Sequence, residues 1–413
     1  MNRRTFLGGL AALVPAAAAG WWWRRREAPP SGAAGQVPPQ PATSPPQLSA
    51  RSASAAAQLD YVGGLPLRVG DARVVPAACG AALEAARALI LRHCTDLGFA
   101  NGAIHGVRAL GRDIPFGASD PFRVLLERYT EEKYLEGRVL LEVPVRQEGH
   151  RHAMLKTLIE KQCDLDLPFE HEGRAYRFRD YVESARVLFG TDDAQPLDEQ
   201  SWTLMALARV VPAHRSHWTN LHGHSVDLGT LIDRTSAALL QDTELVRQLD
   251  VDRAEVPRNC PAFGRVCGGL HMHYALAVAL SCGYGNARRR SEFQRHMQTL
   301  VRRFRYDLKV VDQVERLNGE RVGAERASIT AFDARLKFLG HAFEIVGLAR
   351  QFDLYAFDAA ESVHVDAARQ TLCDVLAHAE AVSWNAIQAD RQLYESVVSG
   401  ICHAYNGLLL DAA

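Results

Sequence analysis

A short motif built around histidine recurs along the chain, and this recurrence constrains the fold more than any other feature of the sequence. Three segments share the pattern G-x-x-H-x-x-x-[A/G]-L: residues 102–110, 268–276 and 400–408. Looser copies begin at Gly149 and Gly340, and a segment from Ser201 keeps the small and apolar positions without the histidine. A motif that recurs at such intervals is typical of folds built from repeated helical units.

The residues between these motifs have helical periodicity. Apolar residues recur at i, i+3 and i+4 in five segments: residues 81–91, 122–135, 181–189, 228–240 and 293–311. These segments are amphipathic, whereas the histidine-bearing segments are rich in Ala and Gly and apolar on all sides, which is typical of inner helices. Each interval between motif starts is long enough for one helix out and one helix back.

The sequence therefore predicts an all-α fold, an α/α toroid of about six hairpins with an inner and an outer ring of helices. Convincing pairs of alternating strands are missing from the sequence. Residues 61–69 and 138–145 are short exceptions, and we expect them to be extended connections.

Equivalent positions in such a ring bring distant histidines to one mouth. We expect this mouth to be lined by the five histidines His105, His150, His271, His341 and His403. A glycine before each helix start would let a ligand approach the backbone. Helix dipoles and like charge would keep the imidazoles neutral, as a general base or a metal ligand must be.

Two details refine this expectation. Positions two apart on a helix point about 200° from each other, so His271 faces the mouth and His273 packs outward. His341 and Glu344 lie three residues apart on one face, where the carboxylate can hold the imidazole tautomer or act as an acid. We expect His271 and His403 to be the base and acid, with His341 oriented by Glu344.

The N-terminus resembles a twin-arginine export signal. Arg3 and Arg4 precede an uncharged run that ends in Trp21–Trp23, so residues 1–27 are expected to be a signal or a membrane anchor. Residues 28–58 are rich in Pro, Ala and Ser and predict a disordered linker. Residues 59–413 then form one toroid domain in the periplasm or cell envelope, and only the N-terminal segment would meet a membrane.

Charge and cysteine usage exclude several classes of protein. The net charge is −1, and residues 1–58 hold six Arg against one Glu, so the remaining body carries −6 and is mildly acidic without a basic stripe. That argues against nucleic-acid binding. The eight cysteines occur singly without a Cys-x-x-Cys pair, which argues against zinc knuckles and thioredoxin-like redox chemistry. We expect them to be free and buried.

Parts of the chain resemble an uncharacterised family of large helical proteins associated with exported proteins of environmental bacteria. The resemblance covers residues from about 147 to 409 and rests on C-G-G-x-H at 267–271, G-H-x-x-E at 340–344 and H-A-x-N-G at 403–407. It implies a helical repeat protein with a toroid-like fold, and it implies no known activity.

Other motifs are less specific. Cys282-Gly-Tyr-Gly and Cys402-His403 are faintly similar to the zinc-bearing motifs of lanthionine cyclases, which are also α/α toroids, so zinc stays an alternative. His222 and His224 precede Asp227, which favours a capping loop over a metal site. Trp202 is expected in the core or at the rim of the mouth. Nucleophile elbows, Walker loops, dinucleotide fingerprints and H-E-x-x-H motifs do not occur.

The expected function is acid/base hydrolysis or elimination on a carbohydrate or cell-envelope substrate, without a cofactor. The alternatives are a non-catalytic toroid that binds a small molecule, a carbohydrate or a partner, and a zinc-dependent enzyme.

Overall fold

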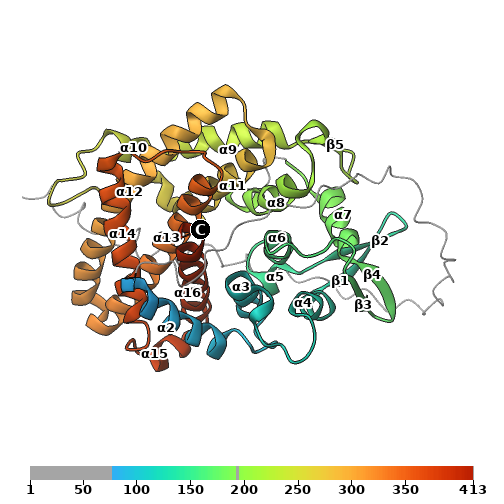
Figure 1. Ribbon diagram of the computed structural model, residues 1–413, viewed down its shortest axis with the longest axis horizontal. Coiled ribbons are helices and arrows are strands. Elements are labelled where there is room, and N and C mark those ends of the chain that lie inside the picture. Colours follow the sequence, from blue (N-terminus) through green and yellow to red (C-terminus); the bar gives the residue numbers. More distant parts are fainter. Residues whose placement is uncertain (1–76, 192–194, 413) are drawn as a thin grey trace, which may run out of the picture. The chain divides into compact units, whose positions relative to one another are not determined.

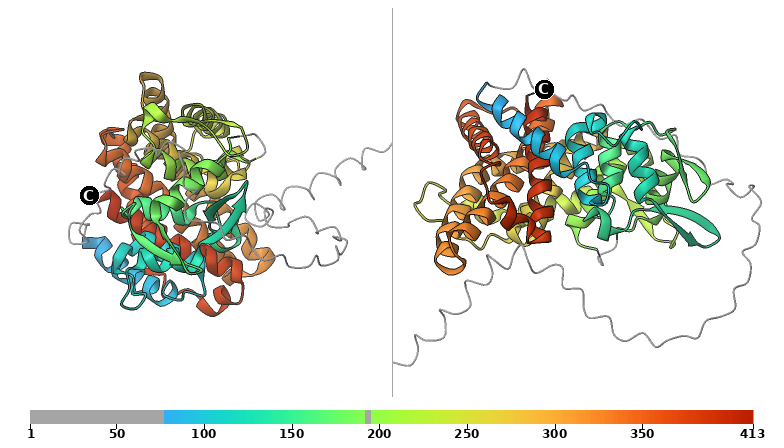
Figure 2. Two further views of the ribbon diagram at one scale, coloured as in Figure 1. Left: turned by 90° about the vertical axis from the view of Figure 1, so that its right-hand side faces the viewer. Right: turned by 90° about the horizontal axis from the view of Figure 1, so that it is seen from below.

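The computed structural model describes residues 77–191 and 195–412, which belong to one compact unit. The predicted signal, the linker and residues 61–69 lie outside the described residues. The described chain is mainly helical, with short two-stranded hairpins, so the prediction of an all-α class is confirmed (Figures 1 and 2).

The buried centre is made of six helices that carry the repeated motifs: α3 (Ala100–Leu110), α6 (Ala153–Glu160), α8 (Leu197–Val210), α11 (Leu270–Ala279), α13 (Ala324–Gln351) and α16 (Arg391–Asp411). Every residue of α6 and α11 is buried, and so are Phe338–Ala349 of α13 and Val397–Leu410 of α16. Their Ala, Gly and large apolar residues leave no polar stripe for solvent. Each helix contacts the next in this order, and α16 contacts α3.

A second set of helices buries one face and exposes the other: α2 (Ala77–His93), α4 (Pro121–Tyr129), α7 (Phe178–Leu188), α9 (Leu228–Asp242), α12 (Ala287–Val322) and α14 (Ala359–Ala377). Side-chain caps begin several of them. Asp227 accepts hydrogen bonds from the Gly229 and Thr230 amides, as the sequence predicted for this capping loop.

Shorter elements complete the chain. The remaining α-helices are α5 (Val145–Glu148), α10 (Glu244–Gln248) and α15 (Trp384–Gln388). The 3₁₀ turns are η1 (Gly111–Asp113), η2 (Ala213–Arg215), η3 (Pro261–Gly264) and η4 (Val266–Gly269), and η5 (Leu280–Tyr284) is a π-helical turn.

Three antiparallel hairpins correct the prediction of extended connections. The strands are β1 (Glu131–Leu135) with β2 (Arg138–Glu142), β3 (Pro168–His171) with β4 (Arg174–Arg177), and β5 (His217–Thr219) with β6 (Ser225–Asp227). The helix predicted over residues 122–135 therefore stops at Tyr129, and residues 138–142 are a paired strand. The first two turns are Glu136-Gly137 and Glu172-Gly173, all with positive φ, which is the backbone that two-residue hairpin turns require.

The glycines of α13 and α16 serve helix packing. A Cβ added at Gly340 would lie 2.7 Å from the Ala404 backbone nitrogen, and one at Gly407 would lie 2.6 Å from the Gly340 carbonyl oxygen. Gly340 and Gly400 also lie inside long helices that begin at Ala324 and Arg391. The predictions of helix starts at 340 and 400, and of glycines that admit a ligand there, are therefore wrong.

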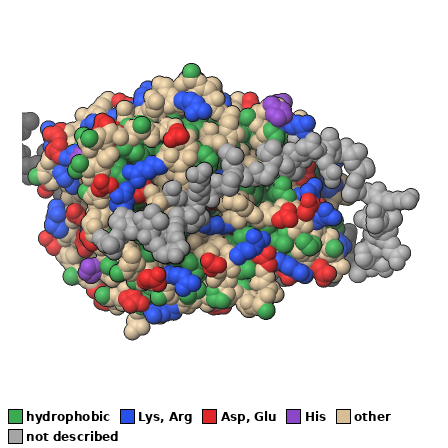
Figure 3. Space-filling view, viewed as in Figure 1, with side chains coloured by type: hydrophobic (Ala, Val, Ile, Leu, Met, Phe, Trp, Pro, Cys, Tyr) green, Lys and Arg blue, Asp and Glu red, His purple; other side chains and the backbone are tan. Residues whose placement is uncertain are grey.

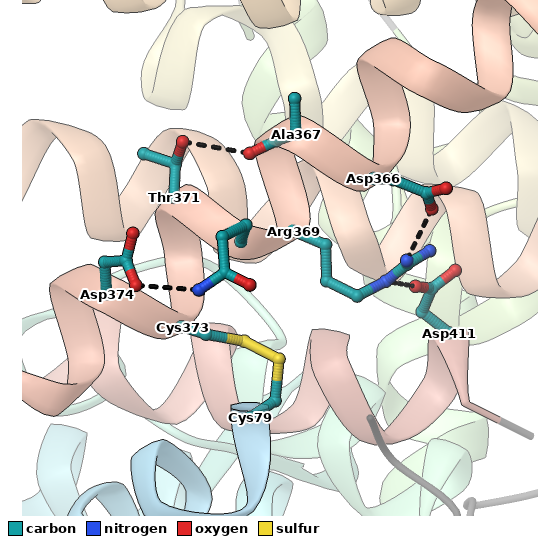
Figure 4. Close-up of a disulfide and its surroundings, with 9 residues drawn as sticks. Cys79, Asp366, Ala367, Arg369, Thr371, Cys373, Asp374 and Asp411 are labelled. Atoms are coloured by element: carbon teal, nitrogen blue, oxygen red, sulfur yellow. Dashed lines mark hydrogen bonds and ion pairs between the residues drawn. A yellow bond between two sulfur atoms is a disulfide. The ribbon is translucent and has the colours of Figure 1, made fainter. Parts of the chain in front are cut away.

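A disulfide joins Cys79 on α2 to Cys373 on α14 (Figure 4). The expectation of free cysteines is wrong for this pair, because two helices far apart in the sequence pack side by side. Beside it, Arg369 pairs with Asp366 on its own helix and with Asp411 at the end of α16. The other cysteines are free.

One helical stretch of the described residues, Val266–Tyr284, is long and apolar enough to cross a membrane. It contains α11, and 72% of its most apolar window is buried inside the protein. Burial of this extent is also found in the core helices of globular proteins.

Candidate functional site

The structure brings all five predicted histidines into one continuous cluster. Ring centroids are 5.2 Å apart for His150 and His271, 4.6 Å for His271 and His341, 3.8 Å for His341 and His403, and 5.1 Å for His403 and His105. His150 is half-buried and the other four are at most 5% exposed. Residues up to about 300 positions apart thus share one site.

Each histidine reaches the cluster from a different part of the chain. His105 lies in the second turn of α3, His150 precedes α6, and His271 is the second residue of α11. His341 and His403 lie well inside α13 and α16. The expectation that helix N-termini hold every imidazole is therefore wrong for these two, because both helices extend more than two turns before the motif.

Glu344 is the centre of the hydrogen-bond network. Its carboxylate accepts from His341 Nδ1 at 3.2 Å and from His403 Nδ1 at 3.2 Å. It also accepts from Arg108 Nε at 2.9 Å and from Asn406 Nδ2 at 2.8 Å. Burial favours the neutral acid, but Arg108 and His403 hold the pKa of Glu344 well below its usual value. The carboxylate is therefore ionised and fully used as an acceptor.

An ionised Glu344 determines the imidazole tautomers. His341 and His403 must each carry the proton on Nδ1 to donate to it, so each has its lone pair on Nε2. The Nε2 atoms of His341 and His271 are 3.2 Å apart, which makes His271 the donor of that hydrogen bond. His271 Nδ1 is then a lone pair, and it is buried without a partner. Two ring nitrogens, on His271 and His403, are thus left for another group.

The pKa values of the four most buried histidines are lowered, which favours their neutral form as expected, but the main cause differs from the predicted one. Burial lowers the pKa of His105 to about 3, and it lowers the pKa of His271 and His403 well below 6.5. Neighbouring histidines and Arg108 add to the effect. Desolvation therefore outweighs the helix dipole, which contributes only about 0.3–1 kcal/mol.

A second charged network lies next to the first. Arg108 joins the two, since its Nη1 donates to Glu160 at 3.2 Å. Glu160 also pairs with Lys156 and accepts a hydrogen bond from Tyr274. The Arg209 guanidinium is buried near Tyr274 and Glu160, and none of its nitrogens makes a hydrogen bond of normal geometry. Three buried cations therefore face two buried carboxylates.

Trp202 covers one side of the cluster. Its ring stacks on His150 at 4.7 Å with an interplanar angle of 11°, and it meets the edge of His271 at 4.6 Å. Trp202 is buried, so it belongs to the core side of the site. His150 also contacts Glu199, at 3.3 Å from Nδ1 to Oε1. The indole and the carboxylate fix the ring of the most exposed histidine.

Several candidates from the sequence lie elsewhere. His273 faces outward against His296, as predicted. His222 and His224 are exposed in the turn between β5 and β6. Cys402 lies 3.7 Å from Cys94, sulfur to sulfur, and Cys282 neighbours Arg209, so the two cysteines of the lanthionine-cyclase-like motifs do not meet.

Two groups of site residues were not predicted from the sequence. The first is the set of buried charges at Arg108, Lys156 and Glu160, which occupy inner helices that looked apolar. The second is Cys267, which lies near His271 and His341. Its signal was present in the C-G-G-x-H motif, where Cys267 and His271 are four residues apart.

A surface cleft of about 440 Å³ lies between the β5–β6 hairpin, α9 and η5. It contains none of the five histidines; of its three charged residues, Arg289 and Asp233 pair with each other at 2.7 Å, and Asp227 caps α9. The described side chains on the face in Figure 3 mix positive and negative charge. The histidine cluster is therefore the stronger candidate for a functional site than this cleft.

No family model, curated protein or solved structure matches the chain.

Proposed function

We propose that this protein is an exported α/α toroid whose histidine cluster performs acid/base chemistry, hydrolysis or elimination, on a carbohydrate or cell-envelope substrate. The observation that carries the proposal is the convergence of five imidazoles from five segments into one cluster, two of them hydrogen-bonded to one ionised carboxylate. The series of helix contacts that returns from α16 to α3 supports the toroid.

His403 is the base in this proposal. Its Nδ1–H donates to Glu344, and its Nε2 has no partner among the described residues. A base oriented by a buried carboxylate is the arrangement used in many hydrolases, because the carboxylate stabilises the imidazolium that forms. Removal of a proton from water or from a sugar carbon would leave that proton on Nε2.

His271 is the corresponding acid. It touches His341 through Nε2 and has an unpartnered Nδ1, which can take up a proton from solvent water and pass it to a leaving group. Because burial lowers the pKa of His271, the protonated ring gives up this proton readily. His341 links the two, since it contacts His271 through Nε2 and Glu344 through Nδ1. His105 and His150 lie at the two ends of the cluster, next to His403 and His271.

The charge balance favours an acidic substrate. Arg209 makes no hydrogen bond of normal geometry, and burying a guanidinium without one is costly. A carboxylate or another acidic group on the substrate would satisfy it. The four most buried histidines are reached by substrate only when neighbouring side chains move.

The Cys79–Cys373 disulfide supports an exported location. Such bonds persist mainly in oxidising compartments outside the cytosol. The charge pattern of the body offers no alternative partner such as nucleic acid.

A product screen with matched variants tests the proposal. The purified chain is incubated with acidic and neutral polysaccharides and with peptidoglycan, and the assay follows new reducing ends for hydrolysis and new conjugated double bonds for elimination. His403→Gln should lower turnover by at least about 100-fold, the usual contribution of a general base. His222→Gln, in an exposed turn, is the control and should leave turnover unchanged.

The alternative is a toroid that only binds. It predicts that no panel member yields product, and that His403→Gln weakens binding of a polysaccharide without any reaction. Binding without product would contradict the proposed catalysis.

A further inference from the structure

We propose that Cys267, His271 and His341 form a binding site for a soft divalent metal ion, with Zn²⁺ as the best fit. The three residues each offer a ligand atom, and these atoms lie within 4.8 Å of one another. The site would deepen the proposed function, but it does not require turnover.

The spacing of the two imidazoles fits a metal. His271 Nε2 and His341 Nε2 face each other at 3.2 Å. Two nitrogens bound to one tetrahedral zinc at about 2.0–2.1 Å lie about 3.3–3.4 Å apart. The separation of the two nitrogens therefore already matches a shared ion, and metal binding would turn the rings so that both lone pairs point at it and bring the nearby thiol closer.

Cys267 has a backbone conformation that non-glycine residues disfavour. Cys267 has φ 46° and ψ 38°, and Gly268 and Gly269 after it also have positive φ. A non-glycine residue in the left-handed region costs about 1–2 kcal/mol. Arg303 holds this turn, because its Nη1 donates to the Gly268 carbonyl at 2.8 Å. The turn places the thiol one helical turn before His271, on the side of His341.

Glu344 orients one of the proposed ligands through a hydrogen bond. It accepts from His341 Nδ1, which leaves Nε2 for the ion, and this carboxylate–histidine–metal order is usual in zinc sites. His341, Glu344 and His403 also lie close enough to hold an ion. That second grouping is less suitable, because both imidazoles turn Nδ1–H toward Glu344 and its oxygens already accept from Arg108 and Asn406.

The ligand set points to zinc. One thiolate and two imidazoles suit Zn²⁺ and exclude Mg²⁺ and Ca²⁺, which require oxygen ligands. Binding converts the Cys267 thiol to a thiolate and releases one proton to solvent. The proton that His271 carries on Nε2 moves to the unpartnered Nδ1, which leaves Nε2 as the ligand atom. Three protein ligands leave a fourth position for water, which is the coordination of catalytic zinc.

The test uses the full-length chain without a histidine tag, stripped of metal and titrated with Zn²⁺ and with Co²⁺. We expect one ion per chain and a sulfur-to-cobalt charge-transfer band. Cys267→Ser should abolish the band and weaken zinc binding by at least about 10-fold, while circular dichroism stays unchanged. Cys282→Ser, another half-buried free cysteine, is the matched control and should keep both.

Less than about 0.2 zinc per chain in the wild type would overturn the site, and so would a band that survives Cys267→Ser or that is equally lost in Cys282→Ser. Failure of the proposed function is seen separately. A chain that binds zinc through Cys267 but yields no product keeps the metal site and loses the catalysis, and a chain with turnover but no metal does the reverse.

Discussion

The Cys79–Cys373 disulfide should be a large single contribution to the stability of the domain. The two cysteines are 294 residues apart, so the bond closes almost the whole described chain into a loop. In the chain-entropy description, a loop of n residues loses about 2.1 + 1.5R ln n cal/mol/K in the unfolded state. For this loop the loss is about 19 cal/mol/K, or about 5.7 kcal/mol at 25 °C.

We therefore expect the variant with both Cys79→Ala and Cys373→Ala to melt at a lower temperature. With an unfolding entropy of about 2.1 cal/mol/K per residue, a loss of 5.7 kcal/mol lowers the melting temperature of a domain of this size by about 8 °C. Calorimetry is the assay, because a domain this large need not unfold in two states. Reductant should lower the melting temperature of the wild type and leave that of the variant unchanged.

The control must separate the effect of the cross-link from the effect of removing two buried sulfur atoms. Cys94 and Cys402 are buried neighbours with sulfurs 3.7 Å apart and no bond between them. The variant with both replaced by alanine removes the same atoms without opening a loop. A fall of less than about 2 °C relative to this control would refute the entropic reasoning.

Three further predictions concern buried charge, helix packing and pH. Arg108→Met should destabilise the domain by about 3–5 kcal/mol in urea unfolding, because it leaves Glu160 and Glu344 buried without their shared partner. Arg209→Met should be neutral or stabilising, because Arg209 makes no hydrogen bond of normal geometry, and equal losses in the two variants would contradict this account. Gly407→Ala should lower the free energy of unfolding by about 1–3 kcal/mol, because its Cβ would lie 2.6 Å from the Gly340 carbonyl oxygen. Gly319→Ala in α12 has open space around it and should raise the free energy of unfolding by about 0.5–1 kcal/mol, and a neutral Gly407→Ala would show that α13 and α16 separate freely. Burial, with Arg247 and Arg295, lowers the pKa of His296 from 6.5 to about 3, so the folded state keeps this histidine neutral and loses stability as the pH falls below about 6.5. At pH 5.5 the loss of stability from His296 alone is about 1.4 kcal/mol, and His296→Gln should reduce the difference in unfolding free energy between pH 7.5 and 5.5 by that amount. If the difference stays the same, the imidazole is not neutral in the fold.

The histidine cluster shows which features of the site the repeated motif predicted and which it did not. His105, His271 and His403 occupy the same position in copies of one motif, and equivalent positions in packed repeats lie close together whatever their separation along the chain. The convergence of the imidazoles was therefore predictable. Their helical context was not, because the lengths of α13 and α16 depend on packing before the motif, and the starts expected at 340 and 400 lie inside these helices.

The missed elements have specific causes. The hairpins at 131–142 and 168–177 rest on Glu-Gly turns and on partners five residues long or shorter, which produce little periodicity. Cys79 and Cys373 carry no local signal, since a disulfide depends only on which helices pack together. Cys267 lies in a left-handed turn that sequence periodicity does not describe.

The sequence by itself determined the helical class, the division into buried and amphipathic helices, and the set of histidines that would meet. These features follow from residue spacing, because residues three or four positions apart lie on the same face of a helix. Only the tertiary structure decided that Glu344 holds two imidazoles, that Arg108 joins two carboxylates, and that Cys267 lies beside His271 and His341. Such contacts depend on distances between helices and on side-chain directions, and these are set when the helices pack.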